Sequence, residues 1–428
     1  MNHTAEKLLT FIKESPTAFQ AVEMMKTRFT ENGFTELKED EHWEIKNGGK
    51  YFVIRNHSAI IAFTVPEVSS DVFHIIASHS DSPSLKIKEN PEMVSAGHYV
   101  ELNAEKYGGM LCAPWFDRPL SIAGRVMVRA DGGVKQRLIN FDRDLVMIPN
   151  LAIHMDRNLN DGYKYNAQKD MIPIWGDEAS EGSFDEMVAA ECGASKEDVV
   201  STDLFLYNRM PGTVWGAQNE YISSPHLDDV QCAYASVKAM LKGHHRESIS
   251  VCCVFDNEEV GSGTKQGAGS TFFPEVLKRI SYLCGKNEEE YYMAVADSFM
   301  LSADNAHAVH PNYQDKTDPT NRPYINEGIV LKYNASQKYT TDANSAALVK
   351  YLCKKEKIKC QVFFNRSDML GGSTLGNILT GQVSIKAADI GLPQLSMHST
   401  YETAGCKDLD DMITLMGSFY ELGKEVQI

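Results

Sequence analysis

The spacing of apolar residues changes along this chain, and each change predicts a different kind of structure. Over residues 5–14 the apolar side chains recur at helical spacing and share one face. Ser15-Pro16 then predicts the start of a second helix, because proline is compatible with the first helical turn. The apolar runs YFVIRN (51–56) and AIIAFTV (59–65) have the length and composition of strands.

A middle segment, from about residue 91 to residue 217, has a pattern typical of β-structure. Its clearest signal is SIAGRVMVRADGGVKQRLI (121–139), in which two β-rich runs flank a Gly-Gly turn, as in a hairpin. Further short apolar runs and polar loops follow it. We therefore expect a separate β-rich domain over residues 91–217.

After about residue 218 the pattern alternates between strand-length apolar runs and helices. Strands are expected at SISVCCVFD (248–256), YYMAVAD (291–297), GIVLKYN (328–334) and KCQVFFN (359–365). Such alternation predicts an α/β fold with a mostly parallel sheet flanked by helices. We expect the strands of residues 51–80 to join the same sheet, so that residues 1–90 and 218–428 form one discontinuous domain. Two consecutive domains are the alternative.

The composition narrows the class of protein. The 428 residues are 43% hydrophobic and 23% charged, which is ordinary for a globular protein of two or three domains. The net charge of −16 argues against a nucleic-acid partner. Charges interrupt the N-terminus, and no apolar run approaches the ~18 residues of a membrane span, so we expect neither a signal peptide nor a membrane protein. The nine cysteines form no CxxC pair, which favours a cytoplasmic location.

Polar residues that could carry chemistry stand beside the ends of these apolar runs. They are His79 and Asp81, Asp228 and Asp229, Glu258 and Glu259, Asp297 and Asp304, and His398. Ligands of open parallel sheets bind beyond the carboxyl ends of the strands, so we expect these side chains to share one edge. Burying so many unpaired carboxylates is unfavourable, and two divalent cations would remove that cost. Histidine and carboxylate ligands suit zinc, with cobalt or manganese as alternatives.

Each of these residues also has a simpler interpretation. Asp228 or Asp229 could cap the helix that follows, and Asp297 could end a strand without binding a metal. The adjacent Glu258 and Glu259 fit the larger scheme, because a two-metal hydrolase needs one free carboxylate as a proton acceptor beside those that bind metal. A turn directly after the strand would let one glutamate bind metal while the other faces the substrate.

Several longer motifs occur in a fixed order along most of the chain. They are HSDSPSLKIK, WFDRPLSIAGRV, IPNLAIHMDRN, SPHLDD, DNEEVGSGTKQGAGS, SADNAHAVHPNY and MHSTYETAG. Taken together, they resemble the aspartyl aminopeptidase family of di-zinc exopeptidases, in a bacterial-type member. The resemblance implies a zinc-exopeptidase-like α/β fold that is interrupted by a β-rich dimerisation or lid domain. It also implies a homo-oligomer, with dimers assembled into a dodecamer.

The resemblance further implies a role for each matching residue. One metal would be bound by His79, Asp228 and Asp304, and the other by Asp228, Glu259 and His398, with Asp228 bridging the two. Glu258 would be the general base, and Asp81 would hold the His79 ring. A cis peptide bond after the bridging aspartate, between Asp228 and Asp229, is a further expectation.

Two more residues would bind the substrate. His154, in IPNLAIHMDRN, matches a histidine that reaches the active site of a neighbouring subunit, whereas the residues alone favour a buried core histidine. Lys332, in IVLKYN, would pair with an acidic substrate side chain, and its alternative is a surface lysine.

Together these features describe a metalloaminopeptidase acting on peptides. A metal-activated water would attack the first peptide bond and release an acidic or neutral N-terminal amino acid. One alternative is a di-metal amidohydrolase or deacylase of the same fold. The other is a non-catalytic assembly protein.

Overall fold

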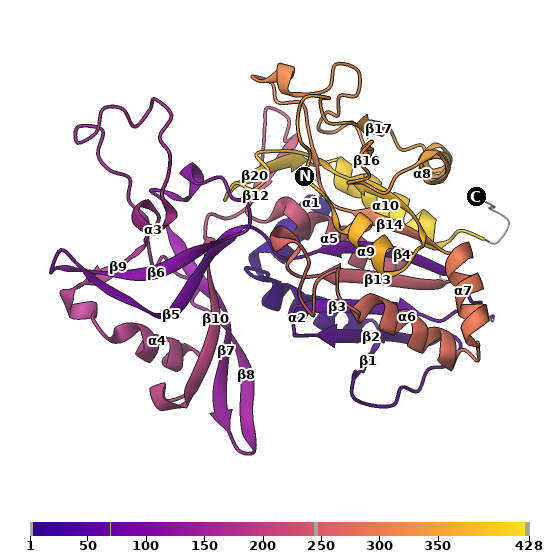
Figure 1. Cartoon of the computed structure of the whole chain (residues 1–428), viewed down its shortest axis with the longest axis horizontal. Helices are drawn as coiled ribbons and strands as arrows, with labels where there is room; N and C mark the ends of the chain where they lie inside the picture. Colours follow the sequence, from indigo (N-terminus) through magenta and orange to yellow (C-terminus); the bar gives the residue numbers. More distant parts are fainter. Residues whose placement is uncertain (1–2, 69, 244–246, 424–428) are drawn as a thin grey trace. The chain divides into compact units, whose positions relative to one another are not determined.

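The computed structural model describes residues 3–68, 70–243 and 247–423, which form two compact units (Figure 1). The first unit comprises Met1–Asp81, Gly212–Met397 and Glu402–Ile428, and the second comprises Ser82–Pro211 and His398–Tyr401. The domain boundaries expected above, 1–90 with 218–428 and 91–217, stay a prediction.

A nine-stranded sheet forms the centre of the first unit (Figure 1). Its order is β1 (Thr35–Leu37), β2 (Lys50–Arg55), β3 (Ala59–Thr64), β13 (Ile249–Phe255), β4 (Phe73–His79), β14 (Phe299–Ala303), β18 (Lys386–Gly391), β16 (Ile329–Lys332) and β17 (Cys360–Phe363). Five neighbouring pairs are parallel and three are antiparallel. The early and late strands therefore share one mostly parallel sheet, which confirms the predicted fold class.

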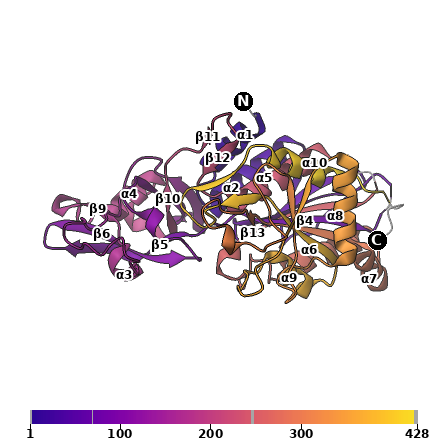
Figure 2. The ribbon, with the colours of Figure 1, turned by 90° about the horizontal axis from the view of Figure 1, so that it is seen from above.

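Helices cover both faces of this sheet, and Figure 2 shows the two layers. One core receives α1 (His3–Lys13), α2 (Ala18–Glu31), α5 (Leu227–Lys242), α8 (Ala343–Glu356) and α10 (Asp408–Tyr420). The other core receives α6 (Phe272–Leu283), α7 (Glu288–Asp297) and α9 (Leu375–Gln382). Along β13, Cys252 and Val254 face the first core while Val251 and Cys253 face the second, as the period of two requires. Among the described residues, we find no helix with the length and apolar character needed to cross a bilayer.

The strand expected over residues 291–297 is wrong, because this segment lies in helix α7. Asn287 and Glu290 form a capping box that satisfies backbone donors at the start of the helix. The buried side chains of α7 follow helical spacing: Tyr291, Ala294 and Val295. Asp297 therefore ends a helix and is exposed, and the strand that follows, β14, begins two residues later.

A smaller five-stranded sheet lies at the carboxyl edge of the large one. Its order is β11 (Thr213–Trp215), β12 (Tyr221–Ser224), β20 (Glu402–Gly405), β19 (Pro393–Leu395) and β15 (Ala306–His307). Strands β15 and β19 follow β14 and β18 almost directly along the chain. This arrangement places the small sheet next to the ends of the strands that carry candidate site residues.

The second unit contains a six-stranded antiparallel sheet around its own core. Its order is β8 (Gly133–Asn140), β7 (Leu120–Ala130), β10 (Val199–Asn208), β5 (Ser84–Ser95), β6 (Tyr99–Tyr107) and β9 (Ile174–Asp177). Strands β7 and β8 pair as the predicted hairpin. The short helix α3 (Ala167–Asp170) and the helix α4 (Ser183–Glu191) complete the unit.

Candidate metal centre

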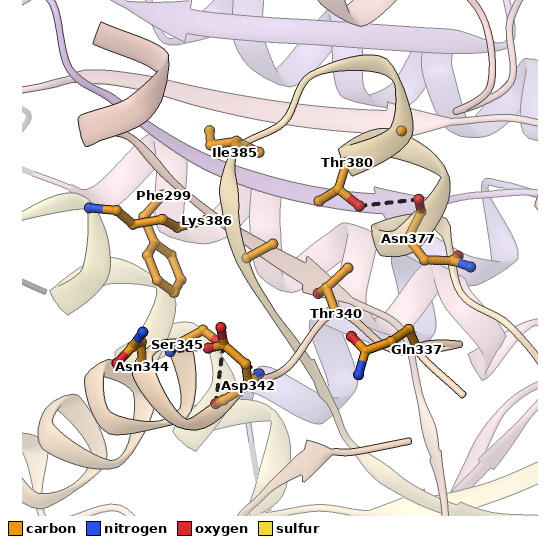
Figure 3. A pocket seen from close by; sticks show the side chains of 12 residues that line it. Phe299, Gln337, Thr340, Asp342, Asn344, Ser345, Asn377, Thr380, Ile385 and Lys386 are labelled. Atoms are coloured by element: carbon orange, nitrogen blue, oxygen red, sulfur yellow. Dashed lines mark hydrogen bonds between the residues drawn. The ribbon is translucent and has the colours of Figure 1, made fainter. Parts of the chain in front are cut away.

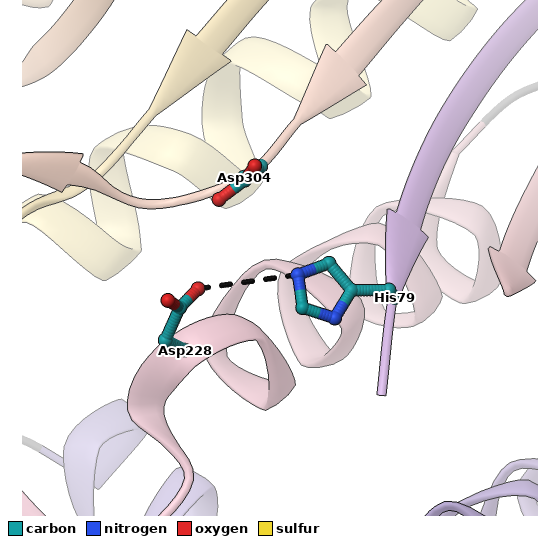
Figure 4. A group of neighbouring side chains, drawn as sticks. All are labelled: His79, Asp228 and Asp304. Carbon is teal, nitrogen blue, oxygen red and sulfur yellow. Dashed lines mark ion pairs between the residues drawn. The ribbon is translucent and has the colours of Figure 1, made fainter. Parts of the chain in front are cut away.

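Three buried side chains meet at the carboxyl edge of the large sheet (Figure 4). His79 is the last residue of β4, Asp304 follows β14, and Asp228 lies in the first turn of α5. Strands β4 and β14 are parallel neighbours, so their ends lie side by side. One ligand atom from each of the three residues lies within 4.8 Å of the others, and His79 Nε2 is 4.0 Å from Asp228 Oδ1.

The backbone at Asp228 departs from helical geometry. Asp228 has φ −87° and ψ 109°, and the peptide bond to Asp229 is cis, as the resemblance led us to expect. The N–H of Asp228 donates to Glu402 Oε2 at 2.9 Å. The N–H of His79 donates to Asp229 Oδ2 at 3.4 Å, which connects β4 to this turn.

The two adjacent glutamates lie in a tight turn and not in the strand. Strand β13 ends at Phe255, Asn257 has φ +61°, and the 3₁₀ turn Glu258–Val260 follows. Asp81 accepts the N–H groups of Glu258 and Glu259, both at 3.1 Å. The turn after β13 is present as expected, and the different targets of the two glutamate side chains stay a prediction.

Asp81 also contacts the His79 ring. The Oδ1 atom of Asp81 lies 3.3 Å from His79 Nδ1, and the main-chain carbonyl of Asp81 lies 3.1 Å from the same nitrogen. The other ring nitrogen, Nε2, is 3.9 Å from Glu258 Oε2. One aspartate thus orients the imidazole and both glutamate amides, and it leaves Nε2 facing the carboxylates.

The electrostatics of this edge fit a bound cation. Burial, together with the nearby carboxylates of Asp304 and Asp81, raises the pKa of Glu258 to about 8, although His79 opposes this shift. Burial also raises the pKa of Asp304, although Lys332 lowers it. Buried carboxylates that raise one another's pKa are destabilised as anions, and a divalent cation relieves this repulsion. The donors, imidazole nitrogen and carboxylate oxygen, are those that zinc accepts.

Two of the expected site histidines belong to the second unit. His398 comes directly after Met397 of the first unit, and its Nδ1 lies 2.8 Å from the carbonyl oxygen of Gly109. Its role as a metal ligand stays a prediction. His154 is exposed, in a loop with Ile153 and Met155. Its interpretation as a buried core residue is therefore wrong, and its role toward a neighbouring subunit stays a prediction.

Lys332 is buried and lies beside Asp304. Its Nζ donates to the carbonyl oxygens of Asp304, at 2.8 Å, and Asn305, at 3.2 Å. The same nitrogen is 3.7 Å from Asp304 Oδ2. Burial lowers the pKa of Lys332, but Asp304 and Tyr339 raise it above its usual value, so the side chain carries a charge. The surface-lysine interpretation is wrong, and the pairing with substrate stays a prediction.

A pocket of about 580 Å³ occupies the opposite edge of the same sheet (Figure 3). It includes Phe299 and Lys386, which are the first residues of β14 and β18, together with polar side chains such as Asn377 and Thr380. Because Asp304 follows the other end of β14, this pocket is separate from the candidate centre.

Sequence reasoning assigned no role to two residues behind the centre, Glu402 and Asn305. Both lie inside motifs that carried the resemblance, MHSTYETAG and SADNAHAVHPNY. An acidic residue four positions after a candidate histidine, within the same motif, is the signal that could have singled out Glu402.

Known proteins match this chain over nearly its whole length. A sequence model of the aminopeptidase I zinc metalloprotease (M18) family matches residues 11–420. A probable M18 family aminopeptidase 2 of Clostridium acetobutylicum is 46% identical over 426 residues, which cover 98% of each chain.

Solved structures show the same fold. The structure of an Ape4 and Nbr1 complex contains a chain with a TM-score of 0.95 and 35% identity, covering 98% of this chain and 86% of that one. The mApe1 dodecamer of S. cerevisiae has a TM-score of 0.86 and 26% identity, with 98% and 97% covered. The resemblance found in the sequence is confirmed, and neither the deacylase nor the assembly-protein alternative gains support. The chain belongs to the M18 family of zinc metalloproteases, and it is a metal-dependent aminopeptidase.

Proposed function

We propose that the protein binds two zinc ions at the candidate centre and releases acidic or neutral N-terminal amino acids from peptides. The observation that carries this proposal is the meeting of His79, Asp228 and Asp304 at one buried edge, with Glu258 and Glu259 beside them. These five residues come from four separate segments of the chain. Helix capping or exposure in a loop could explain any one of them, but would not explain why all five meet at one place.

The ligands divide into two sets that share one residue. His79, Asp228 and Asp304 would hold the first ion, and Asp228, Glu259 and His398 the second. When bound, the ions lower the pKa of a water molecule and polarise the peptide carbonyl. Zinc is the metal of the family, and cobalt or manganese could occupy the same donors.

The remaining site residues of the chain move the proton and hold the geometry. Glu258 is the carboxylate that is left over once the ligands are assigned, so it would accept the proton of the attacking water and pass it to the leaving amine nitrogen. Asp81 would keep His79 and the Glu258 turn in place through the four contacts described above.

Substrate selection and assembly involve residues further from the proton transfer. Lys332 is a buried cation beside Asp304 and would favour an acidic N-terminal residue. The β-rich domain would serve in dimerisation, with His154 completing the site of a neighbouring copy. Support comes from the exposed apolar residues Leu151, Ile153 and Met155 in the same loop, and from the dodecamer formed by mApe1. The cytoplasmic location stays a prediction.

The test is a panel of aminoacyl-anilides carrying Asp, Glu, Leu, Met or Lys, assayed on metal-free protein before and after zinc addition. We expect two ions per chain by metal analysis, activity only with metal, and loss of activity with a chelator. N-acetyl-Leu separates the deacylase alternative, because its only amide bond joins the acetyl group to the amine and its cleavage releases acetate. Faster release of acetate from N-acetyl-Leu than of aniline from Leu anilide would reject the aminopeptidase assignment of this site.

A further inference from the structure

A row of buried polar side chains runs behind the candidate centre, within the first unit. Glu402 begins β20, Gln394 lies in β19, and Asn305 directly follows Asp304. Their exposed fractions are 2%, 1% and 3%. Buried polar groups are retained where they make hydrogen bonds, so the contacts of these three residues indicate what they hold in place.

The three side chains form a continuous hydrogen-bonded path. The path begins at the Asp228 N–H, which donates to Glu402 Oε2 at 2.9 Å. Gln394 Nε2 donates to Glu402 Oε1 at 3.5 Å, and Asn305 Nδ2 donates to Gln394 Oε1 at 2.9 Å. The same Asn305 nitrogen donates to the carbonyl oxygen of Leu227 at 2.8 Å. The path of hydrogen bonds therefore starts at Asp228 and ends at Leu227, the residue before it in the same turn.

The direction of this path is set independently at both ends. The Glu402 carboxylate can only accept, so Gln394 must present its NH₂ group to Glu402 and its oxygen to Asn305. The Leu227 carbonyl can also only accept, so Asn305 must present its NH₂ group there. The two requirements agree, since one Asn305 NH₂ group has a hydrogen for Leu227 and another for Gln394.

We infer that Glu402 is a positioning residue that fixes the main chain at Asp228 and, through Gln394 and Asn305, at the residue after Asp304. The inference rests on the proposed metal centre. Glu402 contacts neither metal nor substrate in this scheme. It acts by fixing the distance between the segment that carries Asp228 and the segment that carries Asp304, which are more than seventy positions apart in sequence.

The substitution Glu402→Gln tests the order of donors and acceptors along this path. The new amide oxygen can still accept from the Asp228 N–H, but its NH₂ group then faces the NH₂ group of Gln394. Rotating the Gln394 amide moves the conflict to Asn305, and rotating Asn305 moves it to the Leu227 carbonyl. The conflict can be relocated but not removed, and a buried polar group is left without a partner.

A second substitution restores every bond. In the double variant Glu402→Gln/Gln394→Glu, the new carboxylate at position 394 accepts from the amide at 402 and from Asn305. The amide oxygen at 402 still accepts from Asp228. The double variant keeps the net charge and the direction of the path, so it is the conservative rescue of the single change.

The experiment measures Co²⁺ binding by the full-length protein, through competition with a chelator and through the visible absorption spectrum of the bound ion. For Glu402→Gln we expect affinity to fall about 10- to 100-fold, as for other groups directly behind metal ligands, with an altered spectrum. The double variant should recover both the affinity and the spectrum. The melting temperature of each metal-free protein reports overall stability separately.

Asp408→Asn is the matched control. Asp408 is likewise a buried carboxylate, and its two donors are both backbone N–H groups, of Asn326 at 2.7 Å and Gly328 at 2.9 Å. Its replacement should change the melting temperature of the metal-free protein without changing the Co²⁺ spectrum or affinity. A merely structural Glu402 would behave in the same way as this control.

Three results would overturn the inference. Wild-type affinity and spectrum in Glu402→Gln would do so, as would a double variant no better than the single one. If Glu402→Gln does not fold, the double variant decides alone, and its failure to bind Co²⁺ like the wild type counts against the inference. A wild-type protein that binds no Co²⁺ or Zn²⁺ instead rejects the proposed metal centre itself.

Discussion

The two sheets of this protein are covered in different ways. In the first unit, every residue of β3, β13 and β14 is buried, because helices pack on both faces. In the second unit, β8 is mostly exposed, and β7 alternates between buried and more open positions toward its end. A sheet with two covered faces has only its edges available for polar chemistry, whereas a sheet with an open face can use that face for contacts.

This difference explains where the candidate chemistry lies. His79, Asp304 and the Glu258 turn all stand at the carboxyl edge of the fully covered sheet. The second unit contributes exposed apolar residues such as Ile153 and Met155, which suit the proposed assembly role. The predictions below test that division.

The largest effect is expected at Glu258. Glu258→Gln keeps the shape of the side chain but removes the proton acceptor, so kcat should fall about 100- to 10,000-fold. Bound metal should stay at the wild-type level. The measurement is kcat on Leu and Asp anilides together with metal analysis. Glu289→Gln, at an exposed position of α7, is the control, and near-native turnover in Glu258→Gln would remove the proposed base.

The comparison of the two sheets can be tested with one substitution made twice. Val251→Ala in β13 should lower the free energy of unfolding by about 2–3 kcal/mol, because it removes two methyl groups from a closed core. Val134→Ala in β8 should change it by less than about 0.5 kcal/mol, since Val134 is 54% exposed. Denaturant unfolding measures both. Equal losses would contradict the difference in covering.

The contacts of Asp81 predict an effect on metal affinity. Asp81→Asn keeps one acceptor oxygen but places an NH₂ group against a second N–H of the glutamate turn. Zinc affinity should fall about 10- to 100-fold. Titration calorimetry measures the change, with Asp297→Asn at the exposed end of α7 as control. Unchanged affinity would show that Asp81 does not support the centre.

The smallest effect concerns selectivity at Lys332. Lys332→Met should lower the ratio of Asp-anilide to Leu-anilide hydrolysis about tenfold, because a buried charge would no longer face an acidic side chain. The ratio is the informative quantity, because a disturbance of Asp304, which Lys332 also contacts, would lower the rates of hydrolysis of both substrates. An unchanged ratio would leave Lys332 with a positioning role alone.

Local patterns accounted for most of the fold. Alternating and helical spacing located β2, β3, β13, the β7–β8 hairpin, α1 and α2, because these elements bury one or two faces of their own residues. The failure at residues 291–297 has a clear cause. A short apolar run fits a strand and a helix equally well, and the capping box at Asn287 decided the outcome.

For the candidate centre, too, some features could be predicted from the sequence and others could not. The positions of His79, Asp228, Glu258, Glu259 and Asp304 beside apolar runs were visible in the sequence, since polar residues at strand ends mark an edge. The resemblance implied that Asp81 holds the His79 ring, but the hydrogen bonds to the main chain of the other site residues were not visible. Asp81 accepts from amides 177 and 178 positions later, and Glu402 accepts from an amide 174 positions earlier.

The sequence by itself determined most of the strands and helices that were predicted, except at residues 291–297, and most of the polar residues at the sheet edge, except Asp297. Both follow from the period of apolar residues over short stretches of chain. Only the tertiary structure decided how those residues are held: that Lys332 is buried against Asp304, that Asp81 spans two glutamates, and that Glu402 supports Asp228. The reason is physical, because a hydrogen bond between distant segments depends on the path of the chain between them, and no local period records that path.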